Sequence, residues 1–214
     1  MILVLGGTTE GRRTIEVLEE GGGPFLYSTK TGEQEVTLHH GRRIDGALDE
    51  AAMRCVCQEH GVRLIIDAAH PFAAQLHQTV ARVAEQLDIP AIRYERLFPD
   101  RDPSLTWIDD YSEVPHDIGT LLATTGVQSI SRLKPLEAEG VRVVYRILPR
   151  ESSIQLAHQQ GATDDQLCFY EEGGQIDVAA DAILLKESGE SGGFQQKVEA
   201  AKARNMRIIV LKRP

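Results

Sequence analysis

Two glycines and two threonines follow the first apolar run of the chain, in the segment Gly6-Gly-Thr-Thr-Glu-Gly11. Where such a turn joins a strand to a helix, backbone N–H groups and the positive end of the helix dipole point toward a bound phosphate. Gly6 and Gly11 fit the outer positions of the dinucleotide spacing G-x-G-x-x-G, whereas Thr8 stands at the middle one. In the alternative interpretation, the threonines only cap the helix. We predict a cofactor-binding turn made of Gly6, Gly7, Thr8, Thr9 and Glu10.

A second cofactor contact is predicted after the next apolar run, in Tyr27-Ser-Thr-Lys-Thr31. Folds specific for NAD place an acid here to hold the ribose hydroxyls. This chain has hydroxyls and a cation instead, which favours a 2′-phosphate and therefore NADP over NAD. We assign Ser28, Thr29 and Lys30 to cofactor binding, the alternative being that Lys30 is a solvated surface lysine.

Asp67 and His70 lie where a buried run, Leu64–Asp67, passes into the amphipathic stretch 73–87. Strand ends at this edge of a parallel sheet face the ligand, so both residues are candidates to bind substrate. His70 can donate a proton near neutral pH. In the alternative interpretation, Asp67 caps the turn and His70 packs against Phe72, and the residue types alone favour neither.

Two further polar turns lie in the second half, at Thr124-Thr-Gly126 and at Lys186-Glu-Ser-Gly189, which is followed by Gly192 and Gly193. The second turn lacks the order G-x-x-x-x-G-K-[ST], so nucleotide hydrolysis is not expected. We predict that both turns face a ligand, the alternative being plain connections between strand and helix. The patterns Tyr-x-x-x-Lys, H-E-x-x-H and C-x-x-C are missing from the sequence.

Short apolar runs alternate with amphipathic stretches along the chain, which predicts an α/β fold with parallel sheets. The clearest helix covers residues 73–87, with His77 in its apolar stripe, and another follows Gly193 toward Ala203. A helix after the first turn carries Ile15 and Leu18. The expected strands are Ile2–Leu5, Phe25–Ser28, Leu64–Asp67, Ala91–Tyr94, Leu121–Thr124, Val141–Ile147, Leu167–Phe169, Ala182–Leu185 and Ile208–Leu211.

A proline-punctuated stretch from Tyr94 to Leu121 separates two such series of elements. We therefore expect two Rossmann-like lobes, each with a parallel sheet flanked by helices, and a cleft between them. The predicted boundary lies near residue 112. Residues 1–112 form the cofactor-binding lobe in this prediction, and residues 113–214 form the lobe that closes the substrate cleft.

Composition and charge limit the class of protein. The 214 residues are 42% hydrophobic and 26% charged, as in a soluble globular protein. The net charge of −9 argues against nucleic-acid or membrane binding, and the opening segment has no leader character, so we expect a cytoplasmic protein. Cys55, Cys57 and Cys168 are expected to be buried or half-buried free thiols rather than metal ligands. We expect a monomer or a weak homodimer, without a metal.

Short segments spread over the whole chain resemble, in the same order, the signature segments of precorrin-6A reductases. They are Ile2-Leu-Val-Leu-Gly-Gly-Thr-Thr-Glu10, Asp67-Ala-Ala-His-Pro-Phe-Ala73, Arg93-Tyr-Glu-Arg96, Thr124-Thr-Gly126, Ile147-Leu-Pro149, Lys186-Glu-Ser-Gly189 with Gly192-Gly193, and Lys212-Arg-Pro214. Each is short, and together they are specific. Ala69 departs from the family pattern, which has threonine there, and Phe169-Tyr-Glu-Glu172 replaces Gly-Pro-Phe.

The resemblance implies a reductase of cobalamin (vitamin B12) biosynthesis. Such an enzyme uses NADPH to reduce one double bond of precorrin-6A, or of its cobalt form, to the dihydro product, with the tetrapyrrole between two Rossmann-like lobes. His70 is then the candidate proton donor and Lys186 a second catalytic candidate. The substrate-binding candidates are Asp67, His70, Thr125, Gly126, Lys186, Glu187, Ser188 and Gly189.

Both NADPH and a macrocycle fringed with carboxylates are anionic, so an acidic protein must concentrate cations where they bind. The candidates are Arg12, Arg13, Lys30, Arg42, Arg93, Arg96, Arg146, Arg150, Lys186 and Arg213. Two other classes of function compete with this interpretation. One is an NADPH-binding regulatory protein without turnover, and the other is a transferase that binds an anion or a sugar nucleotide.

Overall fold

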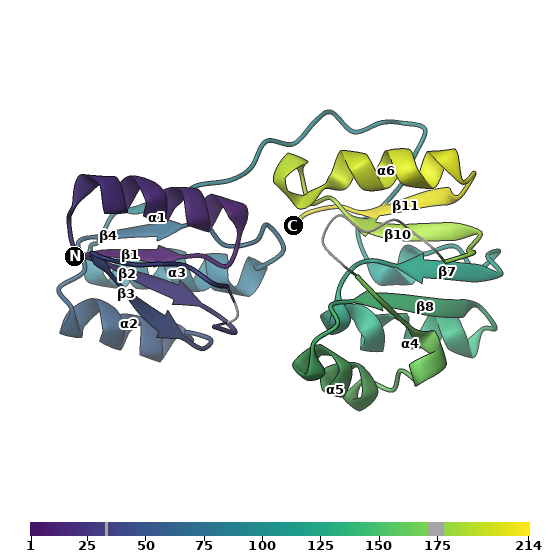
Figure 1. Cartoon of the computed structure of the whole chain (residues 1–214), viewed down its shortest axis with the longest axis horizontal. Helices are drawn as coiled ribbons and strands as arrows, with labels where there is room; N and C mark the ends of the chain where they lie inside the picture. The colour runs from purple at the N-terminus through teal and green to yellow at the C-terminus, as the bar shows by residue number, and fades with distance from the viewer. Residues whose placement is uncertain (33, 171–177) are drawn as a thin grey trace. The chain divides into compact units, whose positions relative to one another are not determined.

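The computed structural model describes residues 1–32, 34–170 and 178–214 (Figure 1). Contacts divide the chain into two compact units, Met1–Arg96 with Pro214, and Leu97–Arg213. The sequence placed the boundary near residue 112 instead. The division falls earlier because strand β6 (Thr106–Ile108) pairs with strand β11 (Arg207–Leu211) of the second unit.

The first unit is built on a five-stranded sheet in the order β3-β2-β1-β4-β5, and every neighbouring pair is parallel. The strands are β1 (Ile2–Leu5), β2 (Phe25–Thr29), β3 (Gly41–Asp45), β4 (Leu64–Asp67) and β5 (Ala91–Arg93), and the helices are α1 (Thr9–Gly21), α2 (Glu50–Glu59) and α3 (Ala74–Leu87).

Helices cover both faces of this sheet. Ile15 of α1 packs with Val4 and Phe25 on one face. Met53 of α2 and Val83 of α3 pack on the other, against the alternate residues of β1. Figure 1 shows the same arrangement, with α1 on one side of β1 and α2 on the opposite side. Because the sheet is buried on both faces, its central strands are continuous apolar runs.

The second unit contains a six-stranded sheet in the order β6-β11-β10-β7-β8-β9, again entirely parallel. The remaining strands are β7 (Thr120–Ala123), β8 (Arg142–Ile147), β9 (Leu167–Phe169) and β10 (Ala182–Lys186). The helices are α4 (Ile130–Ala138), α5 (Glu151–Gln159) and α6 (Phe194–Ala203), with short 3₁₀ turns η1 (Tyr111–Glu113), η2 (Val127–Ser129), η3 (Asp164–Gln166) and η4 (Glu190–Gly192). Phe194 and Val198 of α6 pack on Ile183 and Leu185 of β10.

The predicted fold class, α/β with two parallel sheets flanked by helices, is confirmed. Every predicted strand is present with its bounds shifted by at most a residue or so. The sequence missed β3 and β6, which lie at the ends of their sheets. An edge strand contacts a neighbour on one side only, so it can be as polar as Gly-Arg-Arg-Ile-Asp or as short as Thr-Trp-Ile.

The cysteines are all free, but one expectation about them is wrong. Cys57 is buried and Cys168 is half-buried, whereas Cys55 is exposed, because residues two apart on α2 point to different faces. Within the described ranges, the structure has no helix with the length and apolarity that crossing a membrane would need. Of the segment Phe169-Tyr-Glu-Glu172, the last two residues lie outside the described ones.

Candidate functional site

The predicted site residues gather at one edge of each sheet. In the first unit they follow the carboxyl ends of β1, β2 and β4, which are hydrogen-bonded neighbours. In the second unit they follow β7 and β10, which also pair directly. Ligands of parallel α/β sheets bind at this edge. The topology therefore brings together residues that lie far apart in the sequence, within each unit by itself.

The glycine turn lets helix α1 start close to the sheet. A Cβ on Gly6 would lie 2.2 Å from Cε2 of Tyr27, and one on Gly11 would lie 2.7 Å from the Cα of Gly6. Gly7 has a φ of +86°, which favours glycine, and no atom lies within 4 Å of where its Cβ would be. The backbone of Gly7 therefore faces open space at the N-terminus of α1.

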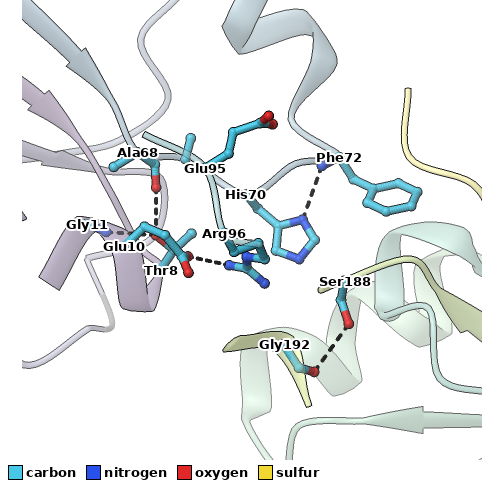
Figure 2. Close-up of polar contacts among 12 residues, drawn as sticks. Thr8, Glu10, Gly11, Ala68, His70, Phe72, Glu95, Arg96, Ser188 and Gly192 are labelled. Carbon is cyan, nitrogen blue, oxygen red and sulfur yellow. Dashed lines mark hydrogen bonds and ion pairs between the residues drawn. The ribbon is translucent and has the colours of Figure 1, made fainter. Parts of the chain in front are cut away.

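Thr8 caps this helix. Its hydroxyl accepts a hydrogen bond from the N–H of Gly11 (2.9 Å) and donates one to the carbonyl of Ala68 (2.6 Å) (Figure 2). The capping alternative is thus observed for Thr8, whose side chain ties β1 to the end of β4. Thr9 is exposed on the first turn. That either threonine also binds a cofactor stays a prediction.

Glu10 forms a buried ion pair. Its Oε2 lies 2.6 Å from an Nη2 of Arg96, and the two side chains are 3% and 4% exposed (Figure 2). The pair joins the first turn of α1 to the segment after β5. The guanidinium neutralises a carboxylate that would otherwise repel an anion at the glycine turn. The predicted role of Glu10 as a direct cofactor ligand is untested, and Arg96 is its observed partner.

Tyr27, which the sequence did not single out, contacts the same turn. Its hydroxyl accepts from the N–H of Gly7 (3.0 Å) and donates to Oε1 of Gln34, whose Nε2 donates to the carbonyl of Thr8 (3.2 Å). Burial raises the pKa of Tyr27, and the Gly7 N–H and the charges of Arg12 and Arg43 oppose that rise. The guanidinium groups of Arg12 and Arg43 therefore add positive charge near the glycine turn.

The end of β2 differs from its prediction in one respect. Ser28 and Thr29 are buried, and Lys30 is exposed. The hydroxyl of Thr29 donates to Oδ1 of Asp45, at 3.0 Å. A carboxylate thus does stand beside β2, supplied by the neighbouring strand β3. The sequence could not show this, because β3 was not predicted.

Asp67 and His77 form a pair at the end of β4. His77 Nδ1 lies 2.6 Å from Oδ2 of Asp67, and its Nε2 lies 3.1 Å from the carbonyl of His70. The ring thus lies between the carboxylate of Asp67 and the backbone of His70. The side chain of His77 is 13% exposed, as expected for the buried stripe of α3, but its ring contacts polar groups. The ring braces the segment that carries His70.

His70 has a defined ring orientation. Its Nδ1 accepts from the N–H of Phe72 at 3.2 Å, and the two rings lie 5.8 Å apart (Figure 2). Because Nδ1 is an acceptor, the neutral ring carries its hydrogen on Nε2. The predicted packing against Phe72 and a chemical role for Nε2 are thus compatible.

In the second unit, Lys186 is the last residue of strand β10 and Glu187 follows it. Burial lowers the pKa of Lys186, because an ammonium loses hydration there. Burial also raises the pKa of Glu187, but hydrogen bonds from Arg101 and from the backbone of Arg213 lower it overall. Arg101 donates to both carboxylate oxygens, at 3.0 and 2.9 Å. Sequence reasoning missed Arg101, which precedes Glu187 by 86 positions.

The remaining predicted residues form two turns at the same edge. Ser188 donates to the carbonyl of Gly192 (3.3 Å; Figure 2), and Gly189 has a φ of +66°. Thr125 shares a 2.6 Å hydrogen bond with Ser129, and Gly126 is exposed with a φ of +87°. Burial raises the pKa of Tyr111, and hydrogen bonds with Thr125 and Ser129 partly offset that rise.

Comparisons with known proteins identify the family of the chain. The family model described as precorrin-6x reductase CbiJ/CobK matches residues 1–214. The cobalt-precorrin-6A reductase of Methanothermobacter thermautotrophicus is 30% identical, covering 100% of this chain and 76% of the relative. That of Priestia megaterium is 29% identical, covering 100% and 91%. The precorrin-6A reductase of Rhodococcus erythropolis is 29% identical, covering 100% and 89%.

A solved structure, titled CobK precorrin-6A reductase, has a similar fold. Its TM-score is 0.75 at 20% identity, and the match covers 100% of this chain and 88% of that one. At this identity the likeness concerns the fold alone.

Proposed function

The chain belongs to the precorrin-6x reductase CbiJ/CobK family, and from that premise we propose that it uses NADPH to reduce one double bond of precorrin-6A, or of its cobalt form, to the dihydro product. It is a reductase of cobalamin biosynthesis, as its relatives' names and its family both indicate. The relatives carry names with and without cobalt, so the proposal covers both forms of the substrate.

The observation that carries the choice of a dinucleotide cofactor is the glycine turn. The open space at Gly7, its positive φ and the close contact of Gly11 with Gly6 are the features that a diphosphate needs at a strand-to-helix turn. The charges of Arg12 and Arg43 act on the same place. The residues present therefore fit a dinucleotide, and the chemistry that NADPH supplies when bound is hydride transfer.

Each unit has its own part in this proposal. The first N–H groups of α1, which follow the glycine turn, bind the diphosphate, and Ser28, Thr29 and Lys30 lie where the adenosine ribose binds. His70 holds a proton on Nε2 for transfer to the substrate, since its Nδ1 accepts a hydrogen bond from the backbone N–H of Phe72.

Lys186 and the turns at Thr125 and Ser188 bind the substrate in the second unit. The half-buried ammonium of Lys186 is only partly hydrated, which strengthens its attraction to the carboxylates of the macrocycle. Its lowered pKa also makes Lys186 a stronger acid than an exposed lysine. Lys186 is thus the second candidate for a catalytic role.

The test follows the nicotinamide absorbance of NADPH in the presence of enzyme and metal-free precorrin-6A, and separately with the cobalt form. The proposal expects absorbance to fall with either substrate, and faster with NADPH than with NADH. Binding of NADPH without consumption would support a regulatory protein instead. Absence of any preference for nicotinamide nucleotides would support a transferase.

A further inference from the structure

We propose that Arg43, on strand β3, binds the 2′-phosphate of the cofactor and so sets the preference for NADPH over NADH. This inference rests on the proposed function, and it names a residue that neither the glycine turn nor the segment after β2 contains. The ligand recognised is a phosphate monoester on a ribose.

Three observations place the guanidinium of Arg43 near the carboxyl end of β2. Arg43 stands beside Tyr27 in the parallel register of β2 and β3, so both side chains point to the same face. An Nη2 of Arg43 donates to the carbonyl of Gly32, just after β2. Its charge also acts on the Tyr27 hydroxyl that binds the N–H of Gly7. Arg43 therefore lies beside the segment that follows β2, where the adenosine ribose binds in Rossmann folds, and close enough to the glycine turn for its charge to act on Tyr27.

The side chain is already held in place. Its Nε donates to Oδ1 of Asp45 at 2.7 Å, and the side chain is 27% exposed. Together with the bond to Gly32, this uses two of the five N–H donors of a guanidinium. A fixed, planar group loses little conformational entropy when it binds phosphate. Lys30, by contrast, is an exposed lysine on a flexible stem.

Asp45 increases the effect of Arg43 on the choice between NADP and NAD. Its carboxylate accepts from Thr29 and Arg43, and the hydrogen bond from Arg43 is the main cause that lowers the pKa of Asp45. A carboxylate beside β2 favours the free ribose hydroxyls of NADH and repels a phosphate. Arg43 offsets that charge. Without Arg43, Asp45 stays ionised, and the chain is expected to bind NAD in preference to NADP.

The experiment compares Arg43→Gln with Arg42→Gln. Arg42 is one of the cations that the sequence suggested for ligand binding, but in the structure it is exposed and points to the face opposite to Arg43 and Tyr27. Both variants therefore lose one positive charge from the same strand, and only Arg43→Gln loses it on the face of Tyr27. Dissociation constants are measured calorimetrically for adenosine 2′,5′-bisphosphate, 5′-AMP, NADP⁺ and NAD⁺. These probes report binding without turnover. Circular dichroism verifies that each variant is folded.

We expect Arg43→Gln to weaken the binding of adenosine 2′,5′-bisphosphate by about 10- to 100-fold, which is the effect of losing a hydrogen bond to a charged group. Binding of 5′-AMP changes less than about threefold, and the NADP⁺ to NAD⁺ preference reverses. Arg42→Gln leaves all four constants near those of the unmodified protein. Arg43→Lys, which keeps the charge, retains an intermediate affinity.

Two results would overturn the inference alone: equal losses in Arg42→Gln and Arg43→Gln, or a loss for 5′-AMP as large as that for the bisphosphate. Both leave reduction by NADPH intact in the unmodified enzyme. If the unmodified protein binds no nicotinamide nucleotide, the proposed function itself fails. The two failures are therefore distinguishable.

Discussion

The buried ion pair between Glu10 and Arg96 allows a quantitative test of the first unit. The two side chains are 3% and 4% exposed, and their charged atoms lie 2.6 Å apart. Replacing Arg96 with methionine keeps most of the side-chain length but leaves the carboxylate of Glu10 buried without its cation. Removing one partner of such a pair costs about 3–5 kcal/mol in the free energy of unfolding. Arg96→Met should lose that amount.

The double variant Glu10→Met with Arg96→Met removes both charges together. Because two buried charges are costly to desolvate, an apolar pair of similar volume is often as stable as the ion pair. We expect the double variant to recover most of the loss. The coupling between the sites, obtained from the cycle of single and double variants, should then be at least about 2 kcal/mol.

Urea unfolding followed by far-ultraviolet circular dichroism gives the free energies. Trp107 is the only tryptophan of the sequence and lies in the second unit, so its fluorescence follows the unit that the substitutions do not touch. The loss should therefore appear in the dichroism more strongly than in the fluorescence. A cost below about 1 kcal/mol for Arg96→Met, or a double variant no more stable than the single one, would refute the reasoning. Recovery of stability without recovery of NADP⁺ affinity would instead show that these side chains also serve binding.

Two further predictions concern the glycine turn and the half-buried Lys186. Gly7→Ala should lower the free energy of unfolding by about 1–2 kcal/mol, since a residue with a Cβ is strained at a φ of +86°, and it should weaken NADP⁺ binding. Gly21→Ala is the control, because Gly21 is an open position in α1 without a positive φ. Equal effects of the two variants in titration calorimetry would contradict the assignment of the turn. Because the pKa of Lys186 is lowered in the folded state, the unfolded chain binds more protons between that pKa and the ordinary lysine value of 10.5, so stability rises with pH across this window. Lys186→Met should abolish the rise, as urea midpoints measured at successive pH values would show, and an unchanged rise would mean that another group causes it.

The elements and the place of the glycine turn could be predicted from local sequence. Runs such as Ile2–Leu5 and Ala182–Lys186 are apolar because both faces of a parallel sheet are covered, and that pattern is visible without coordinates. A glycine turn after the first such run can be placed for the same reason. The polar edge strand β3 carries no such pattern, so Arg43 and Asp45 were missed as site residues.

The partners of the site residues depended on the tertiary structure. Glu10 and Arg96 are 86 positions apart, as are Arg101 and Glu187, and only folding brings each pair together. The residue types indicate that these groups are charged, but not which charges offset one another. His77 shows the same limit, because a helical stripe predicts which face is buried and not that Asp67 of the adjoining strand binds its ring. Periodicity is a property of neighbouring residues, and so the sequence alone determined the α/β fold and the edge of each sheet where the candidate site residues lie. Electrostatic pairing depends on distance in space, and so only the packed strands decided which carboxylate meets which cation.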